Sequence, residues 1–141
     1  VREAEGTGRP LSLIIMDVDD FKRYNDTYGH PEGDIVLRAL ADVITGEIRN
    51  QDAGCRYGGE EFTVVFPDAE AAQSFQAAER IRQSFAGRTF QPGGGITVSV
   101  TVSIGVAQLR QGESASGLIR RADQALYQAK RQGKNRVVTA P

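Results

Sequence analysis

The sequence predicts an α+β fold in which helices flank a ferredoxin-like, palm-type sheet of antiparallel and mixed strands. Three observations support it: an apolar run over residues 11–16, a Gly-Gly pair at residues 58–59 between strand-like segments, and apolar alternation over residues 96–106. Between these segments, apolar residues recur at the spacing of amphipathic helices. The predicted order is strand, two helices, hairpin, helix, strand, helix, strand, which is typical of a split βαβ arrangement.

The first strand, residues 11–16, is almost continuously apolar, as expected of a central strand buried on both faces. It runs directly into the acidic segment Asp17-Val18-Asp19-Asp20. A helix is predicted from about residue 19 to residue 28, and Pro31 suits the first turn of a second helix. This second helix carries apolar residues at helical spacing, namely Leu37, Leu40, Ala41, Ile44 and Ile48.

The Gly58-Gly59 pair predicts a two-residue hairpin turn, because such turns need positive φ angles. The arms are expected at residues 55–57 and 60–66, so that Glu60 begins the second arm. Asp68 is predicted to cap the helix that follows. The buried stripe of that helix is expected to comprise Ala71, Phe75, Ala78, Ile81 and Phe85.

The alternation over residues 96–106 predicts one half-buried strand, bent near Gly105. A last helix follows with Gly133 as its stop, and residues 136–139 are expected to add a short edge strand. The buried positions of this helix are predicted to be Leu118, Ala122, Ala125, Leu126 and Ala129.

Length and composition fit one globular domain, expected over residues 11–141 and preceded by a polar connector over residues 1–10. The formal net charge of −1 offers no basic field for a long nucleic acid. No apolar run approaches the ~20 residues that a membrane-spanning helix needs. Cys55 is the only cysteine, which excludes an internal disulfide and fits a reducing, cytoplasmic setting.

Five acidic residues are candidates for binding a divalent cation. Asp17 and Glu60 lie at the ends of predicted buried strands, so the sheet can bring them together at one edge. Asp19 and Asp20 are better explained as solvated acids that interact with the dipole at a helix start. Strict alternation sends Glu60 and Glu61 to opposite faces, so only one can share a site with Asp17, and periodicity does not decide which.

Three lysines are candidates for holding a triphosphate as point charges. Lys22 lies one turn after the acidic segment, and Lys130 and Lys134 lie at the end of the last helix. Spacing alone favours a simpler interpretation, in which these are solvated cations near helix ends. Arg49 and Asp52 form an Arg-x-x-Asp pattern that by itself indicates only a local ion pair worth about 0–1 kcal/mol.

Asn25 and Asp34 offer the donors and acceptors that a purine edge needs, and a carboxylate suits the N1–H and exocyclic amine of guanine in particular. His30 is the only histidine, so a Cys/His zinc site or a Ser-His-Asp triad is poorly supported. Turn and capping chemistry around Gly29-His30-Pro31 explains the same residues equally well.

Six ordered blocks together cover nearly the whole chain: residues 17–22 (DVDDFK), 25–26 (ND), 29–34 (GHPEGD), 56–62 (RYGGEEF), 102–107 (VSIGVA) and 125–136 (ALYQAK through GKNR). In these blocks the chain resembles the GGDEF domain, the catalytic domain of bacterial diguanylate cyclases. The resemblance implies a nucleotide cyclase-like fold.

The resemblance also implies a set of site residues. Asp17, the Val18 carbonyl and Glu60 would bind two Mg²⁺ ions, with Mn²⁺ as an alternative. Glu60 would in addition be the catalytic base, and Glu61 would have a supporting role. The implied GTP site comprises Lys22, Lys130 and Lys134 at the phosphates and Asn25, His30 and Asp34 around the guanine.

The implied activity is that of a nucleotidyltransferase. It condenses two GTP molecules into cyclic di-GMP and two pyrophosphates, with one GTP held by each domain of a homodimer. Arg49 and Asp52 match the product-inhibition motif of the family, and Arg80 stands where relatives often supply a further arginine. The alternative is a catalytically silent regulatory domain that binds GTP or cyclic di-GMP.

Two residues depart from the family pattern. Asp20 stands where His is frequent, and Lys134 where Arg is frequent. A weaker hold on phosphate is expected, because lysine lacks the bidentate fork of arginine. The leader that usually precedes the domain is also missing, so we expect a truncated leader, with sensor or dimerising domains lying upstream.

Overall fold

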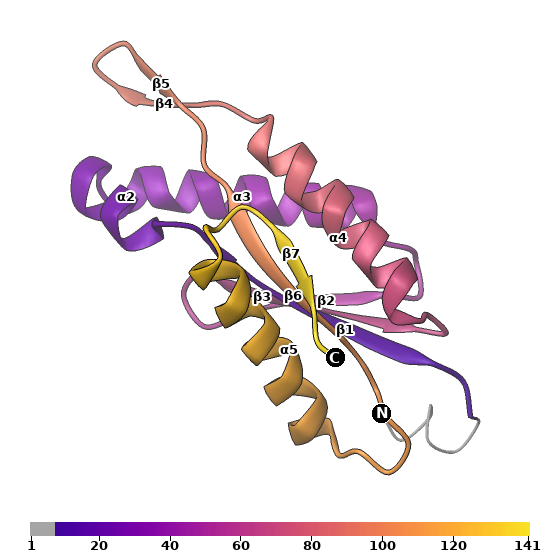
Figure 1. The fold of residues 1–141 in the computed structure, drawn as a ribbon. Coiled ribbons are helices and arrows are strands. Elements are labelled where there is room, and N and C mark those ends of the chain that lie inside the picture. The colour runs from indigo at the N-terminus through magenta and orange to yellow at the C-terminus, as the bar shows by residue number, and fades with distance from the viewer. Residues whose placement is uncertain (1–7) are drawn as a thin grey trace.

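The computed structural model describes residues 8–141 and has the predicted α+β class (Figure 1). A five-stranded sheet has the order β2-β3-β1-β6-β7, and every pair is antiparallel except β6 with β7. Most of the predicted connector lies in residues 1–7, outside the described residues. The strands of this sheet are β1 (Leu11–Val18), β2 (Ala53–Tyr57), β3 (Glu61–Pro67), β6 (Val102–Gln108) and β7 (Val137–Thr139).

The predicted split βαβ arrangement is confirmed, and it occurs twice. Strands β1 and β2 run parallel with β3 between them, and β3 and β6 run parallel with β1 between them. The connecting helices are α2 (Phe21–Tyr28) and α3 (His30–Glu47) in the first unit and α4 (Ala71–Ala86) in the second. Helix α5 (Ala115–Arg131) then leads to β7, the predicted edge strand.

Apolar side chains cover both faces of the sheet. From β1, Ile14 and Met16 enter a cluster shared with α3 and α4, whereas Leu13 and Ile15 enter a second cluster with α5. Figure 1 shows the corresponding layers, with α3 and α4 on one side of the sheet and α5 on the other. Strand β1 is therefore the central strand that its continuous apolar run predicted, and its polar end is held in a fixed position.

The hairpin turn is wider than predicted. Tyr57 pairs with Glu61 across the hairpin, which leaves Gly58, Gly59 and Glu60 in a three-residue loop. Only Gly58 of the two glycines has a positive φ angle, 78°. The guanidinium of Arg56 donates from Nε and Nη2 to the Gly59 carbonyl at 2.9 and 2.6 Å, and these bonds hold the wider loop. Glu60 thus belongs to the loop, and Glu61 begins β3.

The single strand predicted over residues 96–106 is wrong. Strands β4 (Phe90–Gly93) and β5 (Ile96–Val98) form a separate hairpin, which projects from the body at the upper left of Figure 1. The strand is interrupted between β5 and β6. Just before β6, the Thr101 carbonyl accepts a hydrogen bond from the backbone N–H of Asp19 at 2.9 Å, so it is not available for strand pairing. Strand β6 itself is buried on both faces rather than half-buried.

The predicted cap of α4 is also wrong. Glu70 is the N-cap and exchanges hydrogen bonds with Gln73 in a capping box, whereas Asp68 lies earlier with a φ of 55°. The buried stripe of α4 includes Ser74 and Ala77, and Ala71 and Phe75 are only half-buried. The prediction for α5 is confirmed at all five buried positions, Leu118, Ala122, Ala125, Leu126 and Ala129.

Within residues 8–141, no helix is long and apolar enough to cross a membrane.

Gly105, where a bend was predicted, marks a close approach of two elements. A Cβ added there would lie 2.1 Å from the Ala122 carbonyl oxygen and 2.4 Å from the Leu126 nitrogen. Both atoms belong to the backbone of α5, so the helix rests directly on β6 at this point. Any side chain at residue 105 would push α5 away from the sheet.

We expect Gly105→Ala to lower the free energy of unfolding by about 1–3 kcal/mol or more, because the helix backbone cannot yield without repacking. Urea denaturation measures the change. Gly46→Ala, in α3 with no atom within 4 Å of the added Cβ, is the matched control. It should stabilise by about 0.5–1 kcal/mol, since alanine favours the helix. Equal stability of Gly105→Ala and the wild type would contradict the close packing.

Candidate active site

Three carboxyl groups meet where β1 ends. Asp17 pairs directly with Glu61 of β3, and cross-strand partners have their side chains on the same face. The Glu60 carboxyl approaches Asp17 from the hairpin loop, closely enough to raise the pKa of Asp17. The prediction that only one of the two glutamates can approach Asp17 is therefore wrong, since it assumed that Glu60 lies in the strand.

The Asp17 carboxyl is unusually hard to ionise. Burial raises its pKa to about 7, the Lys130 ammonium partly opposes this rise, and the hydrogen bond and charge of Glu60 and the charge of Glu61 add to it. Burial, with the charges of Asp123 and Glu60, also raises the pKa of Glu61. Asp17 Oδ1 is buried without a hydrogen-bond partner. A group of this kind gains from any cation that reaches it.

The donor set fits a hard divalent cation. Asp17, Glu60 and the Val18 carbonyl are all oxygen donors, and the unpartnered Oδ1 of Asp17 has a lone pair to offer. Mg²⁺ characteristically takes one or two carboxylates and completes its shell with water and phosphate oxygens. Among residues 8–141, no group of three or more His, Cys, Asp or Glu side chains is arranged to hold a metal by itself, so an ion here would take two carboxylates at most and fill its shell from water and substrate.

Two of the three candidate lysines are bound to the acidic segment. Lys130 Nζ lies 2.8 Å from Asp19 Oδ1, 3.3 Å from the Asp17 carbonyl and 3.5 Å from the Val18 carbonyl. Lys134 Nζ lies 2.6 Å from Asp20 Oδ1. These contacts replace the simple interpretation of solvated cations near a helix end. Lys22, on α2, is exposed and has no ion-pair partner within the described part of the chain.

Asp19 is not the solvated acid that was expected. Its side chain is 3% exposed, and both carboxylate oxygens accept hydrogen bonds. The donors are the Thr101 hydroxyl at 2.7 Å, the Ser103 hydroxyl at 2.6 Å, the Lys130 ammonium at 2.8 Å and the Asn135 backbone N–H at 3.0 Å. Sequence reasoning missed Thr101, Ser103 and Asn135 as neighbours of the site.

Asp20 is half in solvent, but it is not free. Its carboxylate pairs with Lys134 and, at 3.3 Å, with Arg23, and the hydrogen bond from Lys134 lowers its pKa. Asp20 precedes α2 with a φ of 57° and makes no capping bond with its side chain. The two departures from the family pattern, Asp20 and Lys134, are therefore in direct contact.

The residues expected to contact a base lie where α2 meets α3. Asn25 Oδ1 is buried without a hydrogen-bond partner, and it packs so closely on Gly33 that a Cβ there would lie 1.7 Å away. Asp34 lines a cavity of about 470 Å³ between α3 and the β2–β3 hairpin. His30 is exposed at the start of α3. Gly33, which leaves room for Asn25, was not identified from the sequence.

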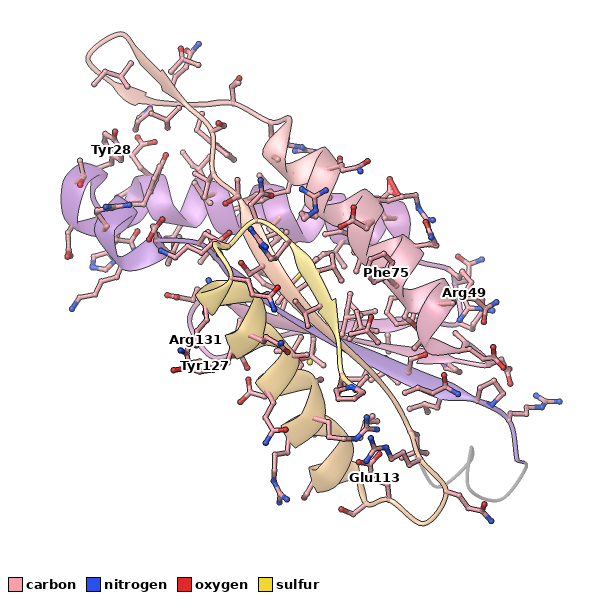
Figure 2. All side chains as sticks on the ribbon, in the orientation of Figure 1. Tyr28, Arg49, Phe75, Glu113, Tyr127 and Arg131 are labelled. Atoms are coloured by element: carbon pink, nitrogen blue, oxygen red, sulfur yellow. The ribbon has the colours of Figure 1, made fainter. Side chains whose placement is uncertain are left out.

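Arg49 and Asp52 form a bidentate pair in which the carboxylate is buried and the guanidinium is partly exposed. Asp52 has 1% of its side chain exposed and accepts from Arg49 Nη2 at 2.7 Å, Nε at 3.1 Å and the backbone N–H at 2.7 Å. Arg80 pairs with Glu47 at 3.1 Å, and these four residues line one cavity of about 300 Å³. Figure 2 shows Arg49 near α4, well away from Tyr127 and Arg131 on α5.

Comparison with known proteins supplies several matches. A family model described as diguanylate cyclase, GGDEF domain, matches residues 1–136. Response regulator PleD of Caulobacter vibrioides is 44% identical over 98% of this chain, which corresponds to 31% of PleD. Diguanylate cyclase A of Treponema denticola is 45% identical over 90% of this chain and 34% of its own length. The chain thus spans about a third of the curated relatives.

Solved structures match over a larger share of their length. The GGDEF domain of DgcB from Caulobacter crescentus, in complex with c-di-GMP, has a TM-score of 0.94 and 40% identity, with 99% of this chain and 82% of that one covered. The active GGEEF domain of a diguanylate cyclase from Vibrio cholerae has a TM-score of 0.93 and 38% identity, with 99% and 88% covered.

The raised pKa of Asp17 predicts that this carboxyl destabilises the fold near neutral pH. Its pKa is about 7 in the folded state, against an ordinary value of 3.8, so the folded state binds more protons between these values. The stability that depends on this proton is complete below about pH 4 and is lost as the pH rises through 7. Removal of the charge should therefore stabilise the protein most at high pH.

We expect Asp17→Asn to raise the free energy of unfolding at pH 8 by up to about 4 kcal/mol, since the shift from 3.8 to about 7 is roughly three pKa units and each unit corresponds to about 1.4 kcal/mol. The gain should largely disappear at pH 4.5. Urea denaturation at the two pH values, in a chelating buffer, measures it. Asp42→Asn, an exposed carboxylate on α3, is the control and should change stability little and equally at both. Loss of stability in Asp17→Asn at pH 8 would contradict the raised pKa.

Proposed function

Because this chain belongs to the diguanylate cyclase GGDEF domain family, we propose that it condenses two GTP molecules into cyclic di-GMP and two pyrophosphates. The proposal assigns residues 11–141 to one catalytic domain. The observation that carries it is the meeting of Asp17, Glu60 and Glu61 beside the Lys130 ammonium. Such a site can hold a cation and a polyphosphate together.

Asp17, Glu60 and the Val18 carbonyl would hold the divalent ions, two Mg²⁺ in each active site. When bound, these ions would polarise the attacking hydroxyl and neutralise charge that builds on the phosphate. The buried Oδ1 of Asp17, which has no partner, supports this assignment. Glu61, directly across from Asp17, would keep the site negative enough to attract a dication.

Each domain would bind one GTP. Asn25, Asp34 and His30 would hold the guanine where α2 meets α3, and the unpartnered Asn25 Oδ1 supports this role by its readiness to accept an N–H. Lys22 is exposed on the first turn of α2 and free to reach the phosphates. Lys130, beside the end of β1, would add a second positive charge near the phosphates. Lys134 would contribute less, because its ammonium is paired with Asp20.

The reaction would take place between two copies of the chain, arranged symmetrically. The 3′-oxygen of one GTP forms a bond to the α-phosphorus of the other, and the bond from that phosphorus to the bridging oxygen of the β-phosphate breaks. Glu60 would accept the proton of the attacking hydroxyl, and pyrophosphate leaves. Repetition of the step with the roles exchanged closes the ring. One chain alone cannot supply both nucleotides, so turnover should depend on protein concentration.

Arg49, Asp52 and Arg80 would form an inhibitory site for the product. The bidentate hold of Asp52 orients the Arg49 guanidinium, and Arg80 lines the same cavity. Guanidinium groups suit both the phosphates and the guanine edges of cyclic di-GMP. Two arginines beside one cavity therefore support a receptor for a doubly charged nucleotide.

We expect Glu60→Gln to reduce GTP turnover by about 100-fold or more, because it removes both an anionic metal ligand and the proposed base. Chromatographic measurement of cyclic di-GMP, over a range of protein and Mg²⁺ concentrations, tests this. Asp42→Asn again serves as the charge-matched control. Full activity of Glu60→Gln would refute its role. A wild type that makes no product at any concentration, even as a tethered dimer, would refute the cyclase and leave a silent nucleotide-binding domain.

We expect Arg49→Ala to weaken the binding of cyclic di-GMP by about tenfold or more, because hydrogen bonds to charged groups contribute about 1.5–3 kcal/mol each. Isothermal titration calorimetry measures the affinity. Arg49→Lys keeps a positive charge beside buried Asp52 but loses the fork, and it should also bind more weakly. Arg120→Ala, exposed on α5, is the control. Unchanged affinity in both Arg49 variants would remove the site from this cavity.

A further inference from the structure

The lysines of this chain have an uneven distribution. Only three of its 17 basic residues are lysines, and the other 14 are arginines. Lys130 and Lys134 both bind carboxylates of the segment that follows Asp17, and Lys22 lies on the first turn of α2 next to it. All three ammonium groups therefore lie around the end of β1, where Arg23 is also present and pairs with Asp20.

The buried carboxylate of Asp19 connects the end of β1 to β6, to α5 and to the segment before β7. It accepts from a residue just before β6, Thr101, from Ser103 within β6, from Lys130 at the end of α5, and from the Asn135 N–H just before β7. Burial of a carboxylate to 3% exposure is costly unless it is paired and fully hydrogen-bonded. Asp19 meets both conditions.

A stable junction alone does not need a charge here, since well-packed apolar side chains stabilise such places at least as well as a buried ion pair. The feature that an apolar residue could not reproduce is the position of the Lys130 ammonium. Asp19 Oδ1 holds it at 2.8 Å, and from there it reaches the Asp17 and Val18 carbonyls and lies 3.8 Å from Asp17 Oδ2. It is thus the counter-cation of Asp17.

Lys130 and a divalent ion would compete for the same oxygens. The Val18 carbonyl and the Asp17 carboxylate are proposed metal ligands, and a dication bound to them repels an ammonium group a few ångströms away. Asp19 Oδ1 takes no part in that donor set, so Lys130 can keep this contact while its ammonium turns from the carbonyls toward the phosphates.

We propose that Asp19 is a positioning residue for this reaction: its carboxylate, fixed by Thr101, Ser103 and Asn135, holds Lys130 against Asp17 and presents the same ammonium to the phosphates when GTP and metal bind. The first half rests on the contacts described above. The second half rests on the proposed function. A lysine suits the task because its flexible stem and point charge can serve two partners in turn.

The contact can be observed directly, because protein labelled with ¹⁵N-lysine gives only three side-chain ammonium signals. Single Lys→Arg variants assign them. We expect Asp19→Asn to move the Lys130 signal toward that of exposed Lys22 and to speed its proton exchange with water, while the Lys134 signal stays in place. Asp20→Asn is the matched control and should move the Lys134 signal alone, since it removes the 2.6 Å pair. An unmoved Lys130 signal in folded Asp19→Asn would overturn the proposal.

Addition of Mg²⁺ and a non-hydrolysable GTP analogue tests the second half. In the wild type the Lys130 signal should shift again but keep its slow exchange, because the bond to Asp19 persists. In Asp19→Asn, kcat should fall at least tenfold while KM changes less than threefold, whereas Asp42→Asn should match the wild type. A loss explained wholly by a lower folded fraction would overturn the positioning role.

If Asp19→Asn does not fold, Thr101→Val gives the same information, since it removes one hydrogen bond to Asp19 Oδ2 with little change in volume. It should shift the Lys130 signal partway in the same direction, and an unshifted signal would overturn the proposal. A wild type without cyclase activity would refute the proposed function, yet the ammonium spectra would still decide whether Asp19 positions Lys130. The two failures are therefore distinguishable.

Discussion

The fold depends on the burial of β1 on both faces of the sheet. Its apolar residues enter one cluster on the α3 and α4 side and a second on the α5 side, so the strand cannot shift along its axis without exposing both. The change from apolar to acidic residues at Asp17 therefore occurs at a fixed point in space. The other parts of the candidate site contact the chain at this point: Glu61 of β3 pairs with Asp17, and Lys130 of α5 donates to the Asp17 carbonyl.

Much of the architecture could be predicted from single elements, because apolar periodicity reports which face of an element is buried. It identified β1, the helices and the five buried positions of α5. It failed where one hydrogen bond between distant residues decides the structure. The hydrogen bonds from the Arg56 guanidinium to the Gly59 carbonyl give the hairpin three loop residues, and the two hydrogen bonds between Asp19 and Thr101 separate β5 from β6. Neither contact changes the spacing of apolar residues in the sequence, so periodicity could not reveal it.

The same limit applies to the site. Asp17, Glu60 and Lys130 were identified as candidates, since acids and cations at strand and helix ends are visible in the sequence. Asp19 was misjudged because its partners lie 82 to 116 residues away, and nothing local distinguishes a buried carboxylate from a solvated one. Likewise, Arg-x-x-Asp spacing gave no indication that Asp52 is buried.

The contact between Asp20 and Lys134 has a consequence for how such domains diverge. Each of these residues alone departs from the pattern that this chain resembles, yet together they form one ion pair of 2.6 Å between the turn before α2 and the loop after α5. An exchange of Lys134 for the frequent Arg would keep a cation opposite Asp20, whereas an exchange of Asp20 for the frequent His would leave the Lys134 ammonium without its carboxylate. Asp20 should consequently be inherited together with a cation at residue 134, and a chimera that joins halves of two such domains should take both positions from the same parent.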